Sequence, residues 1–492
     1  MNAVIGLDCS TSAVKAVAFD PCGVVLAEGR AGIETKVLGG DMFEQDPEAW
    51  WTAACTALRL LMQSLPELHP VALAIANQRE TIAFLDASFR PLRPAILWMD
   101  GRAREDVNRL AARLGSERLH QVTGKTPDPN PALYKLAWMR RMEPSVLDAS
   151  RRLAEVHSYL AWRLTGRFAT SIASADPLGV FDLVEGRYAD ELLAEVGVAA
   201  DCFAEALAPG TPIARLRPVA SEATGLPAGL MVVAGGGDGQ AAGLAVNIAR
   251  PGRAYLNLGT AVVSGIYSRK YRLGAAFRTM ISAGDPGFVL ESSLRSGTLI
   301  CDWLARDIFR DPGSLVRLEK EAQRLPPGAD GVLLLPYFLG VMTPHWDGAV
   351  RGAILGLAPH HGQAHLVRAL FEGIAQEQAD VTERILAATG LALSEIVVMG
   401  GGSRSDLWCS ILADTMRVTL LRTATAEASA LGAAMAAAVG IGWFGDFDQA
   451  ASAMAAPITA RFDPDAGRVA LYAALARRYR SIYPRLAGLD VS

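Results

Sequence analysis

Two short segments, one in each half of the 492-residue chain, share a pattern of apolar run, tight polar turn and apolar run. The first is IGLDCSTSAVKAVAF from residue 5, and the second is AYLNLGTAVVSGIYS from residue 254. When NLGT at 257–260 is laid over DCST at 8–11, both turns join runs typical of a β-hairpin. Although so short a match can arise by chance, the chain is too long for one core, and we expect two similar domains.

Both turns place polar groups between apolar strands. The residues concerned are Asp8, Ser10, Thr11 and Ser12 in the first turn and Gly259 and Thr260 in the second. A concave row of backbone N–H and hydroxyl donors suits a phosphate, and the carboxylate is available for the accompanying cation. The alternative is an ordinary polar hairpin. Two such hairpins facing each other would hold a polyphosphate from both sides.

A glycine cluster that carries an acid occurs in VVAGGGDGQAAGLA, which begins at residue 232. The glycines end a buried strand and set Asp238 at the start of a helix. Capping of that helix is a role that aspartate performs well. An aspartate exposed at a strand end can also accept a proton from a substrate hydroxyl during phosphoryl transfer, and the two roles are compatible.

Another glycine cluster follows a predicted strand at 396–399 in SEIVVMGGGSRSDLWCSILADTM, which begins at residue 394. Gly400, Gly401 and Gly402 would let a flat ring or a phosphate approach the backbone before a helix that Ser403 or Ser405 caps. The alternative is that the glycines serve packing. Because the small-residue helix EASALGAAM follows at 427–435, this glycine cluster is interpreted as the floor of a nucleotide pocket.

The composition excludes several classes of protein. With 51% hydrophobic and 20% charged residues the chain is globular, and its alternating strand and helix patterns predict α/β architecture. A net charge of -4 without a basic block argues against nucleic acid as a partner. Six scattered cysteines and the lack of a secretory leader predict a cytoplasmic protein. We expect the apolar run from 428 to be a buried helix, and a long helix to span 365–389 and end at Gly390.

Nine motifs, in this order, resemble those of the FGGY carbohydrate kinases over essentially the whole chain. They are GLDCSTSAVK at 6, EQDPEAWW at 44, NQRETIAFLD at 77, RPAILWMDGRA at 93, HSYLAWRLTGRFATSIASAD at 157, GGGDGQAAG at 235, LGT at 258, LPYFLGVMTPHWDGAVRGAILGL at 335 and GGGSRSDLW at 400. The resemblance implies an α/β fold of two actin-like (ribonuclease H-like) ATPase domains with an interdomain cleft. We expect domain 1–246 to bind sugar and supply the base, and domain 247–492 mainly to bind nucleotide.

The resemblance also implies roles for individual residues, with ATP and Mg²⁺ as cofactors. Asp238 is similar to the family's catalytic base, and Asp8 to the acid that holds Mg²⁺, directly or through water. The nucleotide positions are Ser10, Thr11, Ser12, Lys15, Gly259, Thr260, Gly401, Gly402 and Ser405. The sugar positions are Gln78, Arg79, Glu80, Trp98, Asp100, Asn130 and Gln240.

The sugar positions make chemical sense without the family, because an arginine, a glutamate and an aromatic face together suit a row of hydroxyls. Structural alternatives remain open at this stage. Arg79 and Glu80 could simply pair with each other at a strand end. In LWMDGRA, Trp98 could be core and Asp100 could hold Arg102 in a turn.

Departures from the family pattern bear on the substrate. Ser10 replaces a glycine of most members, and LGTAV lacks residues often found after the threonine in xylulose kinases. NQRET at 77 is similar to glycerol kinases, yet Asn130 and Gly239 stand where those enzymes carry tyrosine and glutamine. These smaller residues would enlarge the pocket. We therefore expect a ketopentose such as xylulose, with glycerol or another polyol as the alternative.

Rival functions of another class are a filament-forming or chaperone-type ATPase and a non-catalytic, actin-like sugar sensor. The first would not need Arg79, Glu80 and an acid at 238 in one cleft. The presence of Asp8, Thr11, Asp238 and Thr260 argues against the second. We expect a small sugar or polyol as the partner, with no nucleic acid and no membrane, and the sequence leaves open whether the protein is a monomer or a homodimer.

Overall fold

The first sheet of the computed structural model, which describes residues 1–424 and 427–489, has six strands in the order β14-β15-β6-β1-β2-β3. Their bounds are β1 Asn2–Cys9, β2 Ala13–Phe19, β3 Val25–Gly32, β6 His69–Asn77, β14 Pro212–Arg215 and β15 Met231–Gly237. β1 pairs antiparallel with β2 and parallel with β6, and β6 is parallel to β15. β1 is buried along almost its whole length, as expected of a central strand covered on both faces.

The second sheet has seven strands in the order β18-β19-β17-β16-β22-β23-β24. Their bounds are β16 Arg253–Leu258, β17 Val262–Ser268, β18 Arg278–Ile281, β19 Phe288–Leu294, β22 Glu395–Met399, β23 Thr419–Thr423 and β24 Ile458–Phe462. β16 pairs antiparallel with β17 and parallel with β22, and β22 is parallel to β23. The strand predicted at 396–399 is therefore confirmed.

The two predicted hairpins occupy corresponding positions in the two sheets. β1 and β16 each pair with the following strand on one side and with a later parallel strand on the other. The turns, at 10–12 and 259–261, have the same length and begin directly after Cys9 and Leu258. The alignment of NLGT with DCST thus describes a real structural repeat, which confirms the expectation of two similar α/β domains.

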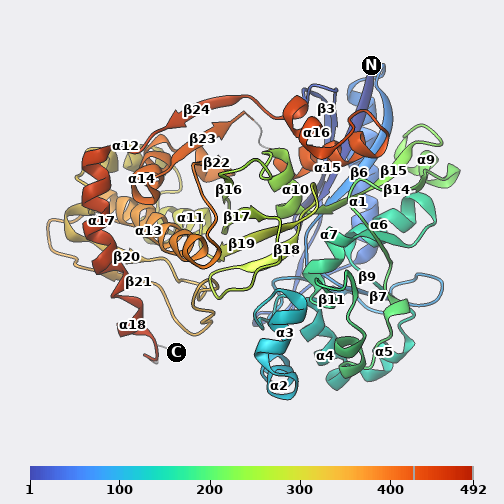
Figure 1. The fold of residues 1–492 in the computed structure, drawn as a ribbon, viewed down its shortest axis with the longest axis horizontal. Coiled ribbons are helices and arrows are strands. Elements are labelled where there is room, and N and C mark those ends of the chain that lie inside the picture. Colours follow the sequence, from blue (N-terminus) through green and yellow to red (C-terminus); the bar gives the residue numbers. More distant parts are fainter. Residues whose placement is uncertain (425–426, 490–492) are drawn as a thin grey trace.

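Helices cover both sheets (Figure 1). α1 (Pro47–Ser64) packs on β2 and β3 of the first sheet. In the second half α13 (Gln363–Thr389) packs against α12 (Leu315–Gln323) and α14 (Asp406–Met416). Gly390 adopts φ 69° and its N–H bonds to the carbonyl of Leu386, which confirms the predicted end of the long helix.

Two helices join the halves through close backbone contact. α10 (Asp238–Ala245) packs against α15 (Ala428–Gly440), which also packs on β1, β6 and β15 of the first sheet. A Cβ at Gly6 would lie 1.8 Å from the carbonyl oxygen of Ala430, and one at Gly432 would lie 1.9 Å from that of Ala241. The apolar run from 428 is therefore a buried helix, as predicted, and it lies between the halves.

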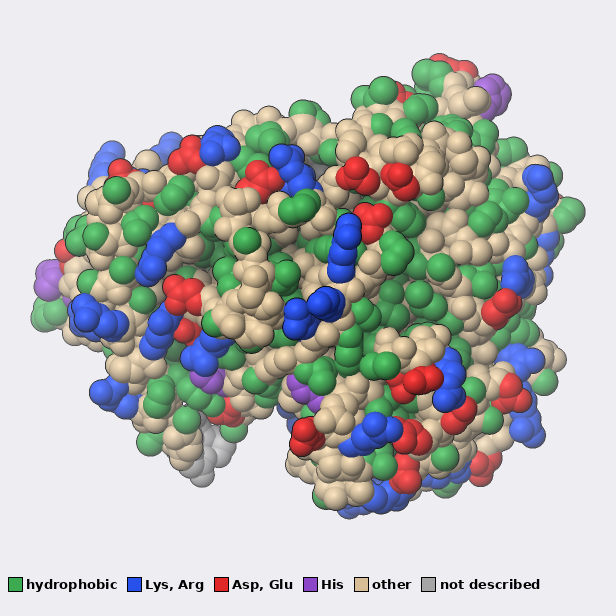
Figure 2. All heavy atoms as spheres, viewed as in Figure 1, with side chains coloured by type: hydrophobic (Ala, Val, Ile, Leu, Met, Phe, Trp, Pro, Cys, Tyr) green, Lys and Arg blue, Asp and Glu red, His purple; other side chains and the backbone are tan. Residues whose placement is uncertain are grey.

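The remaining helices and strands lie outside the two large sheets. In the N-terminal half they are β4 Lys36–Val37, β5 Phe43–Gln45, β7 Ala83–Leu85, β8 Ala95–Ile96, α2 Arg104–Leu114, α3 Ser116–Thr123, α4 Ala132–Met142, α5 Pro144–Ala149, β9 Arg152–Ala154, α6 Val156–Thr165, β10 Ala169–Ser171, α7 Ile172–Ala175, β11 Phe181–Asp182, β12 Arg187–Tyr188, α8 Asp190–Glu195, β13 Glu205–Leu207 and α9 Pro218–Thr224. In the C-terminal half they are α11 Thr298–Trp303, β20 Leu333–Leu335, β21 Ala353–Leu355, α16 Phe447–Met454, α17 Ala466–Arg480 and α18 Tyr483–Leu486. Figure 2 shows a hollow between the C-terminal half at the left and the lobe that carries α2 to α5 at the lower right. Within the described ranges no helix is long and apolar enough to cross a membrane.

Candidate active site

The first turn presents a threonine whose hydroxyl is held by the neighbouring loops. Trp98 Nε1 donates to Thr11 Oγ1 over 2.9 Å, and Thr11 Oγ1 lies 3.4 Å from Gln78 Oε1. Ser10 is used by the turn itself, because its hydroxyl donates to the carbonyl of Ala13. Ser12 is exposed, and in the second turn Thr260 is exposed. Trp98 is half-buried and tied to the turn, so it is not simply a core residue.

The carboxylate of Asp8 lies at the end of β1 and is 8% exposed. Burial, together with the nearby Asp238, raises the pKa of Asp8 to about 7, and Lys15 acts in the opposite direction. Its Oδ1 has no hydrogen-bond partner. A buried carboxylate oxygen that faces a second acid and lacks a donor fits a divalent cation. The described residues include no cluster of three His, Cys, Asp or Glu, and Mg²⁺ needs none, since it keeps waters and binds substrate phosphates.

Lys15 lies on β2 rather than in the turn. Its ammonium contacts the carboxylate of Glu427, with Nζ to Oε distances of 2.7 and 2.9 Å. Glu427 directly precedes α15, so this ion pair links the first hairpin to the helix between the halves. Lys15 is thus engaged within the protein in this structure.

Asp238 is the first residue of α10, at the end of β15. It does not cap the helix, since Gly237 occupies the N-cap, and the backbone amide that donates to Asp238 Oδ1 is that of the next residue, Gly239, over 2.8 Å. Its side chain is 38% exposed. Surrounding protein raises the pKa of Asp238, whereas Arg79 opposes the rise and Glu291 adds to it.

Arg79 and Glu80 do not pair with each other. Arg79 Nε lies 3.1 Å from Asp238 Oδ1, and Arg79 NH1 donates to Glu291 Oε2 over 2.8 Å. Glu80 accepts from Arg278 NH1 over 2.7 Å, and Arg278 also bonds Glu291 Oε1. The ion pairs therefore form a row of alternating charge, which we call the charged chain. Its members, in order, are Glu80, Arg278, Glu291, Arg79 and Asp238. The predicted alternative, a local pair at a strand end, is wrong.

The backbone around these side chains is fixed by Lys135, which lies on α4 and is fully buried. Its ammonium donates to the carbonyls of Glu80 at 3.1 Å, Trp98 at 3.4 Å and Asn130. Burial lowers the pKa of Lys135 to about 8. One side chain thereby holds three predicted sugar positions together.

Three other predicted sugar positions act in the scaffold. Asp100 is fully buried and binds both Arg102 and the amide of Phe43, as the structural alternative for LWMDGRA proposed. Gln78 is buried and bonds Gln45 Oε1 over 3.1 Å. Gln240 donates to the carbonyls of Ala173 and Ile281. The structure does not bring Asp100 to the charged chain.

Gly239 was expected to leave open space beside the base. A Cβ at Gly239 would lie 3.1 Å from both Arg79 NH2 and Glu291 Oε2. The paired arginine and glutamate therefore fill the space that a larger side chain would need. In this structure the small residue makes room for an ion pair rather than for a longer substrate.

The glycines after β22 differ from one another. A Cβ at Gly401 would meet nothing within 4 Å, so this backbone is open to an approaching group. A Cβ at Gly402 would lie 2.7 Å from the ring of Trp408, so Gly402 serves packing. Ser405 caps α14 by accepting from the amide of Trp408, as predicted, and its hydroxyl also donates to Glu319.

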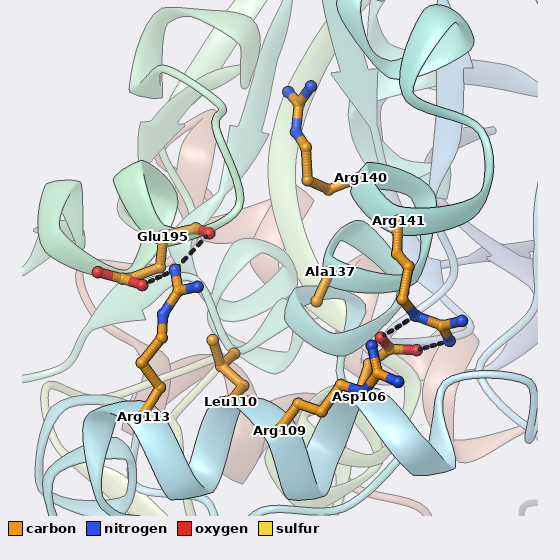
Figure 3. A pocket seen from close by; sticks show the side chains of 8 residues that line it. All are labelled: Asp106, Arg109, Leu110, Arg113, Ala137, Arg140, Arg141 and Glu195. Atoms are coloured by element: carbon orange, nitrogen blue, oxygen red, sulfur yellow. Dashed lines mark hydrogen bonds and ion pairs between the residues drawn. The ribbon is translucent and has the colours of Figure 1, made fainter.

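A separate cavity of about 190 Å³ lies between α2 and α4 (Figure 3). Its charged lining residues are Asp106, Arg109, Arg113, Arg140, Arg141 and Glu195. Figure 3 shows Arg113 bonded to Glu195 and Arg141 bonded to Asp106. None of the residues in the charged chain from Glu80 to Asp238 lines it.

The sequence analysis missed Lys135, Arg278 and Glu291. A signal was present for the last two, because each is a lone charge inside a predominantly apolar strand segment, FRTMIS and FVLESSL. Buried charges of this kind need partners. The sequence gives no indication of which partners they have.

Comparison with known proteins agrees with the two-domain fold. Residues 3–245 match the N-terminal domain, and residues 254–441 the C-terminal domain, of the FGGY family of carbohydrate kinases. The chain is 32% identical to a xylulose kinase of Klebsiella pneumoniae, with 99% of each chain covered. It is 28% identical to a glycerol kinase of Gloeobacter violaceus over 98% of this chain and 96% of that protein. The crystal structure of a xylulose kinase from Rhodospirillum rubrum superposes with a TM-score of 0.91 at 27% identity, covering 98% and 99% of the two chains.

Two α/β domains with similar sheets, together with these matches, define a two-domain carbohydrate kinase. The chain belongs to the FGGY family of carbohydrate kinases. The resemblance found in its nine motifs is confirmed.

Proposed function

We propose that this kinase transfers the γ-phosphoryl group of Mg-ATP to a hydroxyl of a small neutral sugar, with a ketopentose such as xylulose as its substrate. The observation that carries the proposal is Asp238, an accessible carboxylate at the end of a central strand, paired with Arg79. Relatives named xylulose kinase, of which one is 32% identical over the whole chain, support the choice of sugar.

In the proposed reaction Asp238 is the general base. Its raised pKa makes it a better proton acceptor than an ordinary aspartate, and it takes the proton from the sugar hydroxyl as that oxygen attacks phosphorus. Arg79 would orient the hydroxyl row against the base. Domain 1–246 would hold the sugar and domain 247–492 most of the nucleotide, and closure would exclude water as the competing acceptor.

The phosphate groups would lie between the turns at 10–12 and 259–261. Asp8 would hold Mg²⁺, which neutralises charge on the phosphates when it is bound. Thr11 and Thr260 would donate to phosphate oxygens, and Gly401 would let the nucleoside approach the backbone. Lys15 can serve as a phosphate ligand only if it gives up Glu427.

The charged chain supports a neutral substrate over a sugar acid. It contains three carboxylates and two guanidinium groups, so its net charge is negative, and every guanidinium is already paired. An anionic sugar would have to displace one of these carboxylates. Glycerol or another polyol is the second candidate, because NQRET is similar to glycerol kinases and a glycerol kinase is among the relatives.

The test is ADP release by the purified protein with Mg-ATP over xylulose, ribulose, erythritol, glycerol and gluconate. A strong response to one ketopentose supports the proposal. If glycerol gives the strongest response, the polyol assignment replaces it. If no sugar stimulates ADP release, but sugars still protect the protein against heat, the non-catalytic sensor is the better description.

A further inference from the structure

β18 is the edge strand of the second sheet, yet its outer edge is joined to the first half of the chain. The contacts are Thr279 N to Gly124 O at 2.8 Å, Ile281 N to Asp176 Oδ2 at 2.7 Å, Lys125 Nζ to Thr279 O at 3.2 Å and Gln240 Nε2 to Ile281 O at 3.2 Å. Edge strands usually leave such groups unpaired. Here the N-terminal half satisfies them, so β18 is docked in a defined register beside the site.

The docked strand β18 places Arg278 beside Glu80, one of the predicted sugar ligands. Its guanidinium bridges two buried acids, with NH1 2.7 Å from Glu80 Oε1 and NH2 2.8 Å from Glu291 Oε1. Glu291, on the adjacent strand β19, uses its other oxygen to hold Arg79. Two residues of the C-terminal half thus hold two candidate sugar ligands of the N-terminal half.

We propose that Arg278 and Glu291 are positioning residues for sugar binding, which complete the sugar pocket only when β18 is docked on the N-terminal half. The inference rests on the proposed function, because Arg79 and Glu80 are sugar ligands only if the protein binds a sugar. It assigns to β18 and β19 a role in sugar recognition rather than in nucleotide binding.

The backbone of Glu80 explains why its side chain needs external support. Glu80 has φ 64°, a left-handed conformation that a residue with a Cβ adopts only when its surroundings impose it. Lys135 binds its carbonyl and Arg278 binds its carboxylate. Without Arg278 the buried carboxylate would lose the guanidinium that donates to it, and the side chain would turn toward water and away from the sugar.

The planar fork of arginine suits this bridge, because it can donate to two carboxylates at once. Lysine at position 278 would keep the charge, but its single ammonium cannot reproduce two fork-shaped contacts. Arg278→Lys should therefore preserve part of the function that Arg278→Met removes.

The experiment measures the KM for sugar and the KM for ATP of Arg278→Met, Arg278→Lys and Arg253→Met, using the sugar that best stimulates the wild type. Arg253→Met is the matched control, since Arg253 lies in the same sheet, is 12% exposed and pairs with Glu395. Loss of an ionic hydrogen bond should raise the sugar KM of Arg278→Met by about tenfold or more. The sugar KM of Arg278→Lys should lie between those of Arg278→Met and wild type. The KM for ATP of all three variants should stay within about twofold of the wild-type value, because the positioning effect is confined to the sugar site.

An unchanged sugar KM in a folded Arg278→Met protein overturns the inference, as does an equal rise in the KM for sugar and ATP. If Arg278→Met does not fold, Glu291→Gln provides the same comparison, since it removes the charge that holds Arg79 and keeps the shape. Failure of the proposed function is distinct from both results, because the wild type would then show no sugar-dependent release of ADP.

Discussion

Arg79 Nε lies 3.1 Å from Oδ1 of Asp238, so the candidate base has a guanidinium at hydrogen-bond distance. The same guanidinium is shared with Glu291, which weakens its hold on Asp238. Burial raises the pKa of Asp238, Arg79 lowers it and Glu291 raises it. The net effect is a raised pKa, which makes Asp238 a better proton acceptor than an ordinary aspartate.

Replacing the base should remove turnover while leaving nucleotide binding intact. Asp238→Asn keeps the shape of the side chain but cannot accept a proton, and we expect kcat to fall by about 10²–10⁴-fold. The KM for ATP should change little. Asp307→Asn is the control, because Asp307 is exposed and pairs with its neighbour Arg306. Near-normal kcat in Asp238→Asn would remove the assignment of the base.

The pH at which kcat/KM for sugar falls on the acidic side (the acidic limb) of the pH profile should depend on Glu291. A base works only when deprotonated, so kcat/KM for sugar falls as the pH drops through the raised pKa of Asp238. Glu291→Gln removes a negative charge that raises this pKa, and the limb should therefore move to lower pH. The measurement is kcat/KM at saturating Mg-ATP from about pH 5 to 9. A limb that stays in place, or moves to higher pH, contradicts this account of the base.

Lys135 should be needed both for stability and for sugar binding. Lys135→Met leaves three carbonyls without their donor, and we expect a loss of about 2–4 kcal/mol of unfolding free energy and a higher sugar KM. The exposed Lys320→Met is the control. A variant as stable as wild type with an unchanged sugar KM would show that Lys135 does not organise the pocket.

The contribution of Lys135 to stability should depend on pH with a definite sign. Burial lowers its pKa from 10.5 to about 8 in the folded protein. Between these values the unfolded chain holds a proton that the folded protein has released, so stability rises with pH. The difference in unfolding free energy between wild type and Lys135→Met should therefore increase from pH 8 toward pH 10.5. A difference that shrinks over this range would contradict the lowered pKa.

Two neighbouring glycines should give opposite phenotypes. Gly401→Ala adds a methyl group into open space, so it should leave the melting temperature unchanged and raise the KM for ATP if this backbone faces the nucleoside. Gly402→Ala places a methyl group 2.7 Å from the ring of Trp408 and should destabilise the fold by about 1–3 kcal/mol. Thermal melts and ATP titrations of both variants distinguish the two roles. An unchanged KM for ATP in Gly401→Ala would remove Gly401 from the nucleotide site.

The features that sequence predicts well here are those that local residues determine. The hairpins at 10–12 and 259–261, the helix that ends at Gly390 and the cap at Ser405 each depend on residues a few positions apart. Their repetition in two halves was enough to predict two similar domains. Residue types at the strand ends were enough to suggest a kinase site.

The partners of the charged residues could not be predicted, because they depend on how distant segments dock. Glu80 and Arg278 are 198 positions apart, and their pairing follows from the register of β18 against the N-terminal half. For the same reason the burial of the helix from 428 could be predicted, but not the segments that it packs against. Its small residues suit a nucleotide pocket as well as they suit the close contact between Gly6 and Ala430 that the structure contains.

The last prediction concerns the proposed cation site at Asp8. Burial suits this carboxylate to bind a metal, but when no metal is bound the same burial lowers the free energy of unfolding. The folded pKa of Asp8 is about 7, against an ordinary value of 3.8, so between these values the folded protein holds a proton that the unfolded chain has lost. Stability from this residue therefore falls as the pH rises from about 4 to 7, and the cost is constant above that range.

Asp8→Asn is neutral at every pH and should escape this cost. At pH 8 without nucleotide it should be more stable than wild type by about 2–4 kcal/mol, and the gain should vanish near pH 4. Mg²⁺ with ATP should raise the melting temperature of wild type but much less that of Asp8→Asn, which has lost the anionic ligand. Activity should fall and require more Mg²⁺. Two results would contradict the assignment of Asp8 as a destabilising buried carboxylate that binds a cation. One is an Asp8→Asn variant no more stable than wild type at pH 8, and the other is an equal rise in the melting temperature of both proteins with Mg-ATP.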